Sequence, residues 1–162
     1  SACLTDTELL QGLRKTGRPL ILSTGMSSME QINAAVETLG QENLLITHCT
    51  STYPCPDNEL NLKMIETLSR EFDCPIGYSG HEVGLPTSVC AVALGACLVE
   101  RHITLDRAMY GSDQAASIEA SSLKGFVDSV RRIRLMMGDG KKNISPAEVA
   151  VRDKLRVEVP AH

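Results

Sequence analysis

The stretch Pro75–Asp106 limits what this chain can fold into more than any other part of the sequence. It contains two apolar, strand-like runs, and each ends in a polar cluster that includes a histidine, His81 in the first and His102 in the second. The small, apolar residues 86–95 between them are typical of a helix packed on a sheet. A strand, a helix and a strand of this length predict a βαβ unit with parallel strands. Because parallel α/β sheets bind ligands at the carboxyl ends of their strands, we expect the two histidines to converge on one point.

The rest of the chain shows the same alternation of strand and helix patterns. Units of about 30 residues repeat in this way, and eight of them would close a (β/α)8 TIM barrel of roughly 250 residues. The alternative is an open, doubly wound sheet. Hydroxyl or imidazole groups follow every expected strand, which favours a barrel because a barrel gathers all its strand ends around one mouth. We expect strands at 19–25, 43–49, 75–79 and 96–103, and helices at 5–17, 27–39, 58–72, 86–94, 120–137 and 146–155.

The composition excludes several classes of function. The chain has 162 residues, 43% of them hydrophobic, which fits one domain with a sizeable core. The net charge of −4 and an aromatic content of 3% argue against a nucleic-acid-binding protein. No apolar run approaches the roughly 20 residues of a membrane span. The six cysteines form no CxxC pair, so we expect a reducing cytoplasm and no disulfide framework.

His81 and His102 are the candidate metal ligands, with a purely structural role as the alternative. Two imidazoles plus water and substrate oxygens suit a borderline divalent ion such as Mn²⁺, Fe²⁺ or Zn²⁺. With no thiolate partner, an open catalytic position is favoured over a closed structural zinc site. Strand alternation puts Glu100 on the same side as His102, where it would orient a ligand or a metal-bound water, and Arg101 on the opposite face, paired there. We expect His48 to pack in the interior.

Hydroxyl groups recur at three expected strand ends. Ser23, Ser51 and Ser79 could cradle a phosphate or a carboxylate there, although each taken alone is typical of a turn or a cap. Tyr53 and Asp113 lie in loops beyond strand ends. In those positions they could contact the hydroxyl groups of a sugar, or serve only as turn residues.

Several segments together resemble the sialic acid synthase family, whose enzymes condense phosphoenolpyruvate with an amino sugar to make nine-carbon ulosonic acids. They occur in the order and spacing of the family and cover nearly the whole chain. The matching segments are Pro19–Met26, His48–Pro54, Ile76–His81, Ala91–Ala96, Glu100–Asp106, Gly111–Asp113 and Ala116–Glu119.

The resemblance implies an α/β TIM barrel, of which residues 1–140 would supply the second half, about the last four βα units. Residues 141–162 resemble the start of a linker to a further C-terminal domain. The implied enzyme condenses phosphoenolpyruvate with N-acetylmannosamine or its 6-phosphate, with C–O cleavage and release of phosphate. A divalent metal, Mn²⁺ above others, would activate the sugar aldehyde.

The resemblance also implies roles for individual residues. His81 and His102 match the manganese ligands, and Tyr53 and Asp113 match positions that contact the acceptor sugar. The positions matching phosphoenolpyruvate contacts are Ser1, Ser23, Ser51 and Ser79. Two departures leave the sugar open: Cys3 stands where the family usually has an acidic residue, and Gln114 replaces a common histidine.

The first four strands of the family supply lysines for the phosphate and a glutamate for proton transfer, and this chain has no counterpart of them. We therefore expect a half-barrel that needs its missing half, or another copy of itself, to close, and that is inactive alone. Two alternatives remain open at this point. One is a catalytically inert half-barrel that oligomerises, and the other is a metal-dependent hydrolase on an open sheet, for which Glu100 is the available acid or base.

Overall fold

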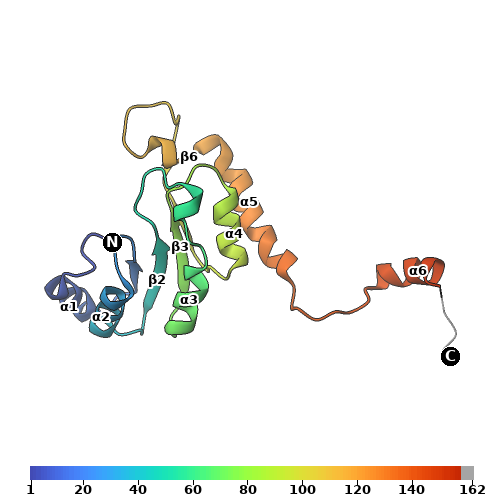
Figure 1. Cartoon of the computed structure of the whole chain (residues 1–162), viewed down its shortest axis with the longest axis horizontal. Helices are drawn as coiled ribbons and strands as arrows, with labels where there is room; N and C mark the ends of the chain where they lie inside the picture. The colour runs from blue at the N-terminus through green and yellow to red at the C-terminus, as the bar shows by residue number, and fades with distance from the viewer. Residues whose placement is uncertain (158–162) are drawn as a thin grey trace.

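The computed structural model describes residues 1–157, so residues 158–162 of the expected extension 141–162 lie outside the described part. Helices and strands alternate along most of the chain, as the sequence predicts (Figure 1). Two short 3₁₀ turns, 57–59 and 114–116, lie in the connections. The elements are α1 Thr7–Lys15, β1 Leu20–Ser23, α2 Met29–Leu39, β2 Leu44–Cys49, α3 Met64–Glu71, β3 Ile76–Gly80, α4 Pro86–Ala93, β4 Val99–Arg101, β5 Ile103–Thr104, β6 Ile118–Glu119, α5 Ala120–Met137 and α6 Pro146–Leu155.

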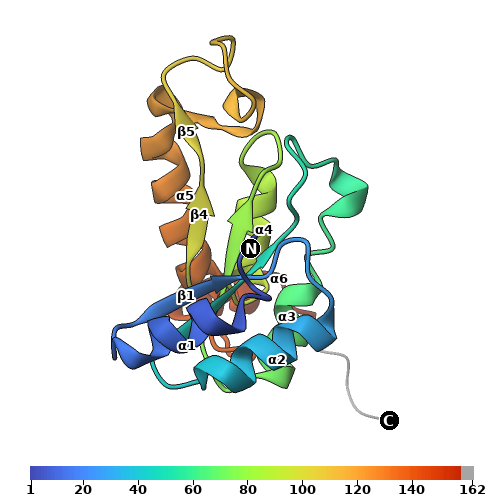
Figure 2. The same ribbon diagram turned by 90° about the vertical axis from the view of Figure 1, so that its left-hand side faces the viewer.

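Strands β1 to β4 form a parallel sheet in chain order. Each strand pairs with the next one along the sequence, and the helix between them returns the chain to the start of the next strand. The sheet twists strongly, so that β1 is rotated far from the direction of β4 (Figure 2). This arrangement is a parallel half-barrel wall with β1 and β4 at its two edges.

The hydrophobic core lies on one face of the sheet. Leu22, Ile46 and Tyr78 point from successive strands into a cluster with buried residues of the helices, such as Ile65 and Leu68. Side chains at alternate positions point the other way. Ile21 on that second face is 58% exposed, because no helix of the described chain covers it. The sheet is therefore packed on one face and open on the other.

Local signals in the sequence set the ends of several helices. Ser28 caps α2 in a capping box with Gln31, as expected from the serines before this helix. Gly138 ends α5 with a φ of 61°, a left-handed conformation that glycine adopts readily. Ser145 caps α6, which starts with Pro146 and stands apart from the other helices at the end of an extended connection (Figure 1).

Two expected elements differ from the structure. The strand expected at 96–103 is interrupted at His102, and β5 leaves the main sheet to pair with β6, where no strand was expected. The helix expected at 58–72 begins only at Met64, because Asn61 has a φ of 44°, which no α-helix accommodates. The strands expected at 19–25, 43–49 and 75–79 and the helix at 120–137 are confirmed.

Two expectations drawn from composition concern the whole chain. All six cysteines are free thiols in the structure. Among residues 1–157, no helix is both long enough and apolar enough to span a membrane.

Candidate active site at the strand ends

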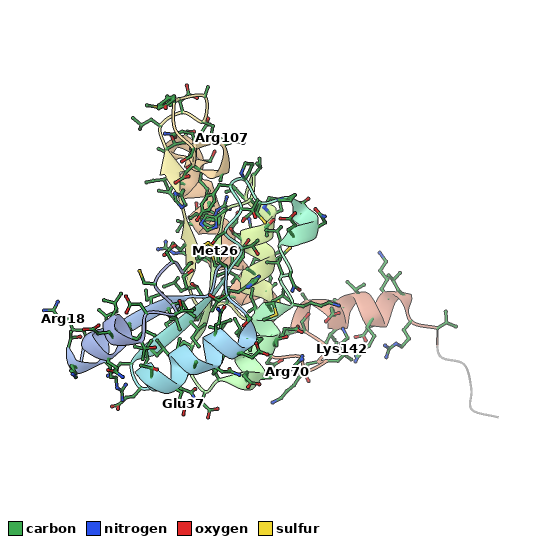
Figure 3. The ribbon with its side chains drawn as sticks, turned by 60° about the vertical axis from the view of Figure 1, so that its left-hand side comes forward. Arg18, Met26, Glu37, Arg70, Arg107 and Lys142 are labelled. Carbon is green, nitrogen blue, oxygen red and sulfur yellow. The ribbon has the colours of Figure 1, made fainter. Side chains whose placement is uncertain are left out.

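The candidate residues gather at the carboxyl ends of β1 to β4. In Figure 3, Met26 follows β1 and lies on the side of the carboxyl strand ends. Glu37 and Arg70, near the C-terminal ends of α2 and α3, lie on the opposite side of the sheet, where the next strands begin. Parallel strands with antiparallel helices produce this polarity. The segments that follow the strands therefore share one mouth, as expected for the location of a ligand site.

His81 and His102 do converge on one point. Their ring centroids are 5.2 Å apart, and the rings meet edge to face. The Nδ1 atom of His81 lies 3.0 Å from the carbonyl oxygen of Thr50. A carbonyl can only accept, so Nδ1 carries the proton, and in the neutral ring Nε2 keeps its lone pair. The structure thus confirms that the two imidazole rings lie side by side, as the βαβ pattern predicts.

Two further expected site residues surround this pair. The ring of Tyr53 lies 4.1 Å from that of His81 and 5.8 Å from that of His102, measured between centroids. The carboxylate Oδ2 of Asp113 lies 3.7 Å from Nδ1 of His102. Tyr53 and Asp113 come from two different loops, after β2 and β5, so both loops contribute to the same mouth.

Cys49 is a member of the site that sequence analysis missed. Its Sγ atom lies 3.9 Å from Nδ1 of His81 and 3.7 Å from Oγ of Ser51. Burial opposes ionisation of the thiol, but hydrogen bonds with His81, Ser23 and Ser51 outweigh it and lower the pKa of Cys49 to about 6. Burial acts against protonation of His81, yet its contacts with Cys49 and Thr50 leave its pKa raised. Strand alternation could have predicted this position, because it points Cys49 to the opposite face from His48, toward the open side of the sheet.

A cluster of hydroxyl groups lies beside Cys49 at the ends of β1 and β2. The Oγ atoms of Ser1 and Ser23 are 2.9 Å apart. Gly25 lines the same space: a Cβ there would collide with Oγ of Ser51 and lie 2.9 Å from both Sγ of Cys49 and Oγ of Ser1. Ser1, Ser23 and Ser51 thus surround one small polar space, which requires a glycine at position 25.

Ser79 and Glu100 form a separate contact across β3 and β4. Ser79 Oγ donates a hydrogen bond to Oε1 of Glu100 over 2.9 Å, and the two residues are register partners in the sheet. Ser79 is buried, whereas Glu100 is exposed on the open face. Ser79 thus orients Glu100, and the hydroxyl cluster at β1 and β2 does not include Ser79.

His48 lies on the opposite, packed face, as expected. Its Nε2 atom is 2.7 Å from the carbonyl oxygen of Leu60, so this nitrogen is the donor. Burial lowers its pKa despite that hydrogen bond. Arg101 also lies on the packed face and pairs there with Glu82, which confirms the expected orientation.

The donors at the mouth fit an open metal site better than a closed one. Among residues 1–157, no group of three or more histidine, cysteine, aspartate or glutamate side chains is arranged to hold a metal ion. Two neighbouring imidazoles, one with its Nδ1 hydrogen-bonded to a carbonyl, leave the remaining positions of an ion to water or substrate. His81 and His102 are the side chains that would hold such an ion.

Comparison with known proteins identifies relatives over almost the full chain. The model of the NeuB family matches residues 1–142. The chain is 44% identical over 156 residues to N-acetylneuraminate-9-phosphate synthase from Homo sapiens, with 94% of this chain and 43% of that protein covered. It is 41% identical over 150 residues to N,N'-diacetyllegionaminic acid synthase from Campylobacter jejuni, with 90% of this chain and 45% of that protein covered.

The fold has a close counterpart among solved structures. The crystal structure of N-acetylneuraminic acid (sialic acid) synthetase from Leptospira borgpetersenii, in complex with citrate, matches with a TM-score of 0.84 and 33% identity. The match covers 97% of this chain and 57% of that chain. The chain thus spans less than half the length of the two curated relatives, and somewhat more than half of the solved chain.

Proposed function

The chain belongs to the NeuB family, and on that premise we propose that it supplies the last four βα units of a nonulosonic acid synthase barrel. Two observations support this assignment. The strands at the sheet's edges, β1 and β4, each have one unpaired side within the described sheet, and its second face leaves Ile21 exposed. Further strands pairing at both edges would enclose that face and turn the half-barrel into a closed one.

The proposed reaction joins phosphoenolpyruvate to an open-chain N-acetylhexosamine, N-acetylmannosamine or its 6-phosphate. The enol carbon C3 of phosphoenolpyruvate attacks the aldehyde carbon of the sugar, which forms the new C–C bond. Water then adds at C2, and phosphate leaves with cleavage of the C–O bond. Two relatives are named as synthases of N-acetylneuraminate 9-phosphate and of N,N'-diacetyllegionaminic acid, and these names support a nonulosonic acid as the product.

His81 and His102 would hold a divalent cation, Mn²⁺ by preference, and their 5.2 Å ring separation is the observation that carries the proposal. When bound, such an ion supplies Lewis-acid polarisation of the sugar aldehyde. Thr50 keeps Nε2 of the neutral His81 ring unprotonated, and this supports its role as a ligand. The carboxylate of Asp113 lies 3.7 Å from Nδ1 of His102, which leaves Nε2 of that ring as the nitrogen to face the ion.

The hydroxyl groups of Ser1, Ser23 and Ser51 would bind the phosphate or carboxylate of phosphoenolpyruvate. Their common space at the ends of β1 and β2, kept open by Gly25, supports this role. Hydroxyl donors suit anions because each can direct its O–H to an anionic oxygen. Ser79 lies outside this cluster, and its proposed role is to hold Glu100 through their hydrogen bond.

The sugar would lie against the remaining side chains of the mouth. Tyr53 and Asp113, on two loops, can reach its hydroxyl and amide groups, and the closeness of both to the histidines supports this. Glu100 is the proposed catalytic carboxylate. Ser79 fixes the carboxylate of Glu100, which would orient the reacting group or the attacking water on the open face. Glu100 would accept the proton that this group or water releases.

Binding of phosphoenolpyruvate to the Mn²⁺-loaded chain, measured by isothermal titration calorimetry, tests this function. We expect saturable binding that Ser23→Ala and Ser51→Ala each weaken about tenfold, the usual loss of a hydrogen bond to a charged group. Ser129→Ala, at an exposed position of α5 where the hydroxyl donates to the backbone carbonyl of Gly125, is the control and should bind as the wild type does. Equal affinity in the wild type, Ser23→Ala and Ser51→Ala would contradict the proposed anion site.

Release of phosphate tests the half-barrel separately. With phosphoenolpyruvate, Mn²⁺ and N-acetylmannosamine or its 6-phosphate, the 162-residue chain alone should not turn over. Turnover by this polypeptide at the rate of a complete synthase would contradict the proposal that other strands contribute to the site.

A further inference from the structure

A buried ion pair lies on the packed side of the sheet, directly behind the two histidines. Nη1 of Arg101 is 2.6 Å from Oε1 of Glu82, and the two side chains are only 2% and 1% exposed. Glu82 follows His81 in the sequence, and Arg101 precedes His102. Neighbouring residues of an extended chain point to opposite faces, so each member of the ion pair lies back to back with one histidine.

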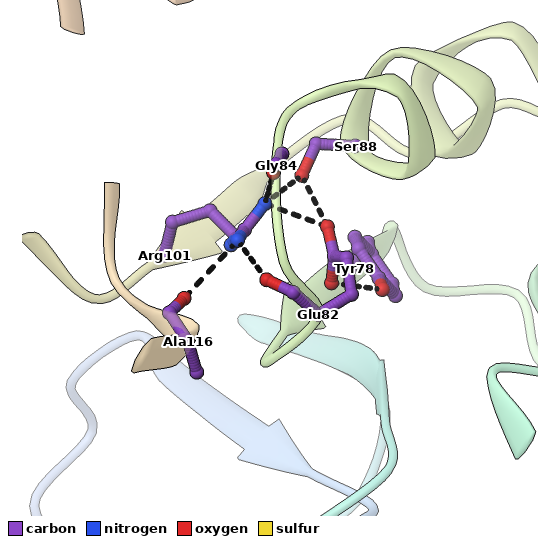
Figure 4. Close-up of polar contacts among 6 residues, drawn as sticks. All are labelled: Tyr78, Glu82, Gly84, Ser88, Arg101 and Ala116. Carbon is purple, nitrogen blue, oxygen red and sulfur yellow. Dashed lines mark hydrogen bonds and ion pairs between the residues drawn. The ribbon is translucent and has the colours of Figure 1, made fainter. Parts of the chain in front are cut away.

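The carboxylate and the guanidinium are both held by several partners (Figure 4). Tyr78 donates to Oε2 of Glu82 over 2.7 Å, and Ser88 donates to Oε1 over 3.1 Å. Nη1 of Arg101 also donates to Oγ of Ser88 and to the carbonyl of Gly84, each over 2.9 Å. The pair therefore joins β3, β4 and the start of α4 at one point. A contact with this many partners permits only one relative position of the strand ends.

The same guanidinium reaches the backbone on both sides of the mouth. Nη2 of Arg101 donates to the carbonyl of Glu82 over 2.6 Å and to the carbonyl of Ala116 over 3.2 Å. The carbonyl of His102 accepts from the backbone N–H of Ile118 over 2.8 Å. Arg101 thus connects the backbone next to His81 with the segment between Asp113 and β6. That segment carries the carboxylate that faces His102.

Stability alone does not account for a charged pair in this place. Removing two charges from water is costly, and apolar residues of similar volume often hold a buried position equally well. What the pair adds beyond packing is a fixed set of hydrogen bonds with defined directions, which hold the backbone at both strand ends. The requirement for a unique geometry exists here, because two imidazoles must present their nitrogens to one ion.

We propose that Glu82 and Arg101 are positioning residues that set the spacing and orientation of His81 and His102 for a shared divalent cation. The identity of the ion rests on the proposed function, whereas the control of ring spacing does not. Neither side chain touches the ion or the substrate; both act through the backbone beside the histidines and through the segment from Asp113 to Ala116.

Three variants of the full chain separate positioning from general stability. Arg101→Lys keeps the charge but loses the fork of donors, and Glu82→Gln keeps the shape but loses the charge. The double variant Glu82→Met with Arg101→Met fills the space with apolar side chains and leaves no buried charge. Asp128→Asn, which breaks the equally short but exposed ion pair with Lys124, is the matched control.

Two readouts are measured after circular dichroism has confirmed that a variant is folded. One is Mn²⁺ affinity by electron paramagnetic resonance. The other is the nuclear Overhauser effect between the ring protons of His81 and His102 in the metal-free protein. We expect Arg101→Lys, Glu82→Gln and the double variant to bind Mn²⁺ at least tenfold more weakly and to lose intensity in the ring-to-ring effect. The control should match the wild type in both.

Wild-type Mn²⁺ affinity and wild-type ring-to-ring intensity in a folded double variant would overturn the proposal. If the double variant does not fold, the same result in folded Arg101→Lys overturns it. A wild-type chain that binds no Mn²⁺ contradicts the metal site of the proposed function instead. In that case the ring-to-ring intensities of the variants still decide whether the ion pair positions the histidines.

Discussion

Nδ1 of His81 lies 3.0 Å from the carbonyl oxygen of Thr50, and this contact determines which nitrogen of the neutral ring is free. At alkaline pH, above its raised pKa, His81 should therefore carry its proton on Nδ1. Nitrogen-15 NMR of labelled imidazoles distinguishes the two tautomers directly. His48 should show the opposite tautomer, because its Nε2 donates to Leu60. Finding the same tautomer in both rings would contradict these hydrogen bonds.

Gly25→Ala should damage the hydroxyl cluster without unfolding the chain. The added methyl group would collide with Oγ of Ser51 and crowd Cys49 and Ser1, so these groups must move apart. We expect phosphoenolpyruvate affinity to fall about tenfold, equal to about 1.4 kcal/mol. Gly12→Ala is the control: its Cβ would meet no atom within 4 Å, and it should stabilise α1 slightly. Calorimetric titration of both variants checks this, and equal affinities would argue against the cluster as the anion site.

His48 should make stability depend on pH. Burial lowers the pKa of His48 below its ordinary value of 6.5, so the folded state binds this proton less readily than the unfolded chain does. The contribution of His48 to the free energy of unfolding is complete above pH 6.5 and is lost as the pH falls toward the lowered pKa of the folded state. The loss amounts to about 1.4 kcal/mol for each unit by which the two pKa values differ. Urea unfolding of the wild type and of His48→Gln measures the effect. The destabilisation caused by His48→Gln should shrink as the pH falls; a difference that grows in acid would refute it.

The packed face of the sheet should supply most of the stability. Leu68 in α3 is completely buried, and Leu68→Ala should lower the free energy of unfolding by about 2–5 kcal/mol through lost contacts and a residual cavity. Leu135 in α5 is 83% exposed, and Leu135→Ala should change it by about 0.5 kcal/mol or less. Chemical denaturation compares the two, and similar losses would contradict the assigned core.

Much of this arrangement could be predicted from the sequence, because strand and helix periodicities place both histidines at parallel strand ends. The same alternation predicted that Arg101 points away from the mouth. Its partner Glu82 was not predicted, because nothing in a linear pattern distinguishes a buried carboxylate from a solvated one. The break at His102 was also missed: β5 and β6 are two residues each, and their pairing depends on contacts between segments far apart in the sequence. The roles of all the proposed site residues stay predictions: Ser1, Ser23, Ser51, Tyr53, Ser79, His81, Glu100, His102 and Asp113.

Mn²⁺ binding to the 162-residue chain, followed by electron paramagnetic resonance, tests the central claim most directly. We predict that the wild type binds one ion per chain and that His81→Ala and His102→Ala each reduce the affinity at least tenfold, since each removes one of two imidazole ligands. Folded His48→Gln, which removes an imidazole from the opposite face, should retain wild-type affinity. Equal Mn²⁺ affinity in the wild type, His81→Ala and His102→Ala would contradict a shared ion between the two strands.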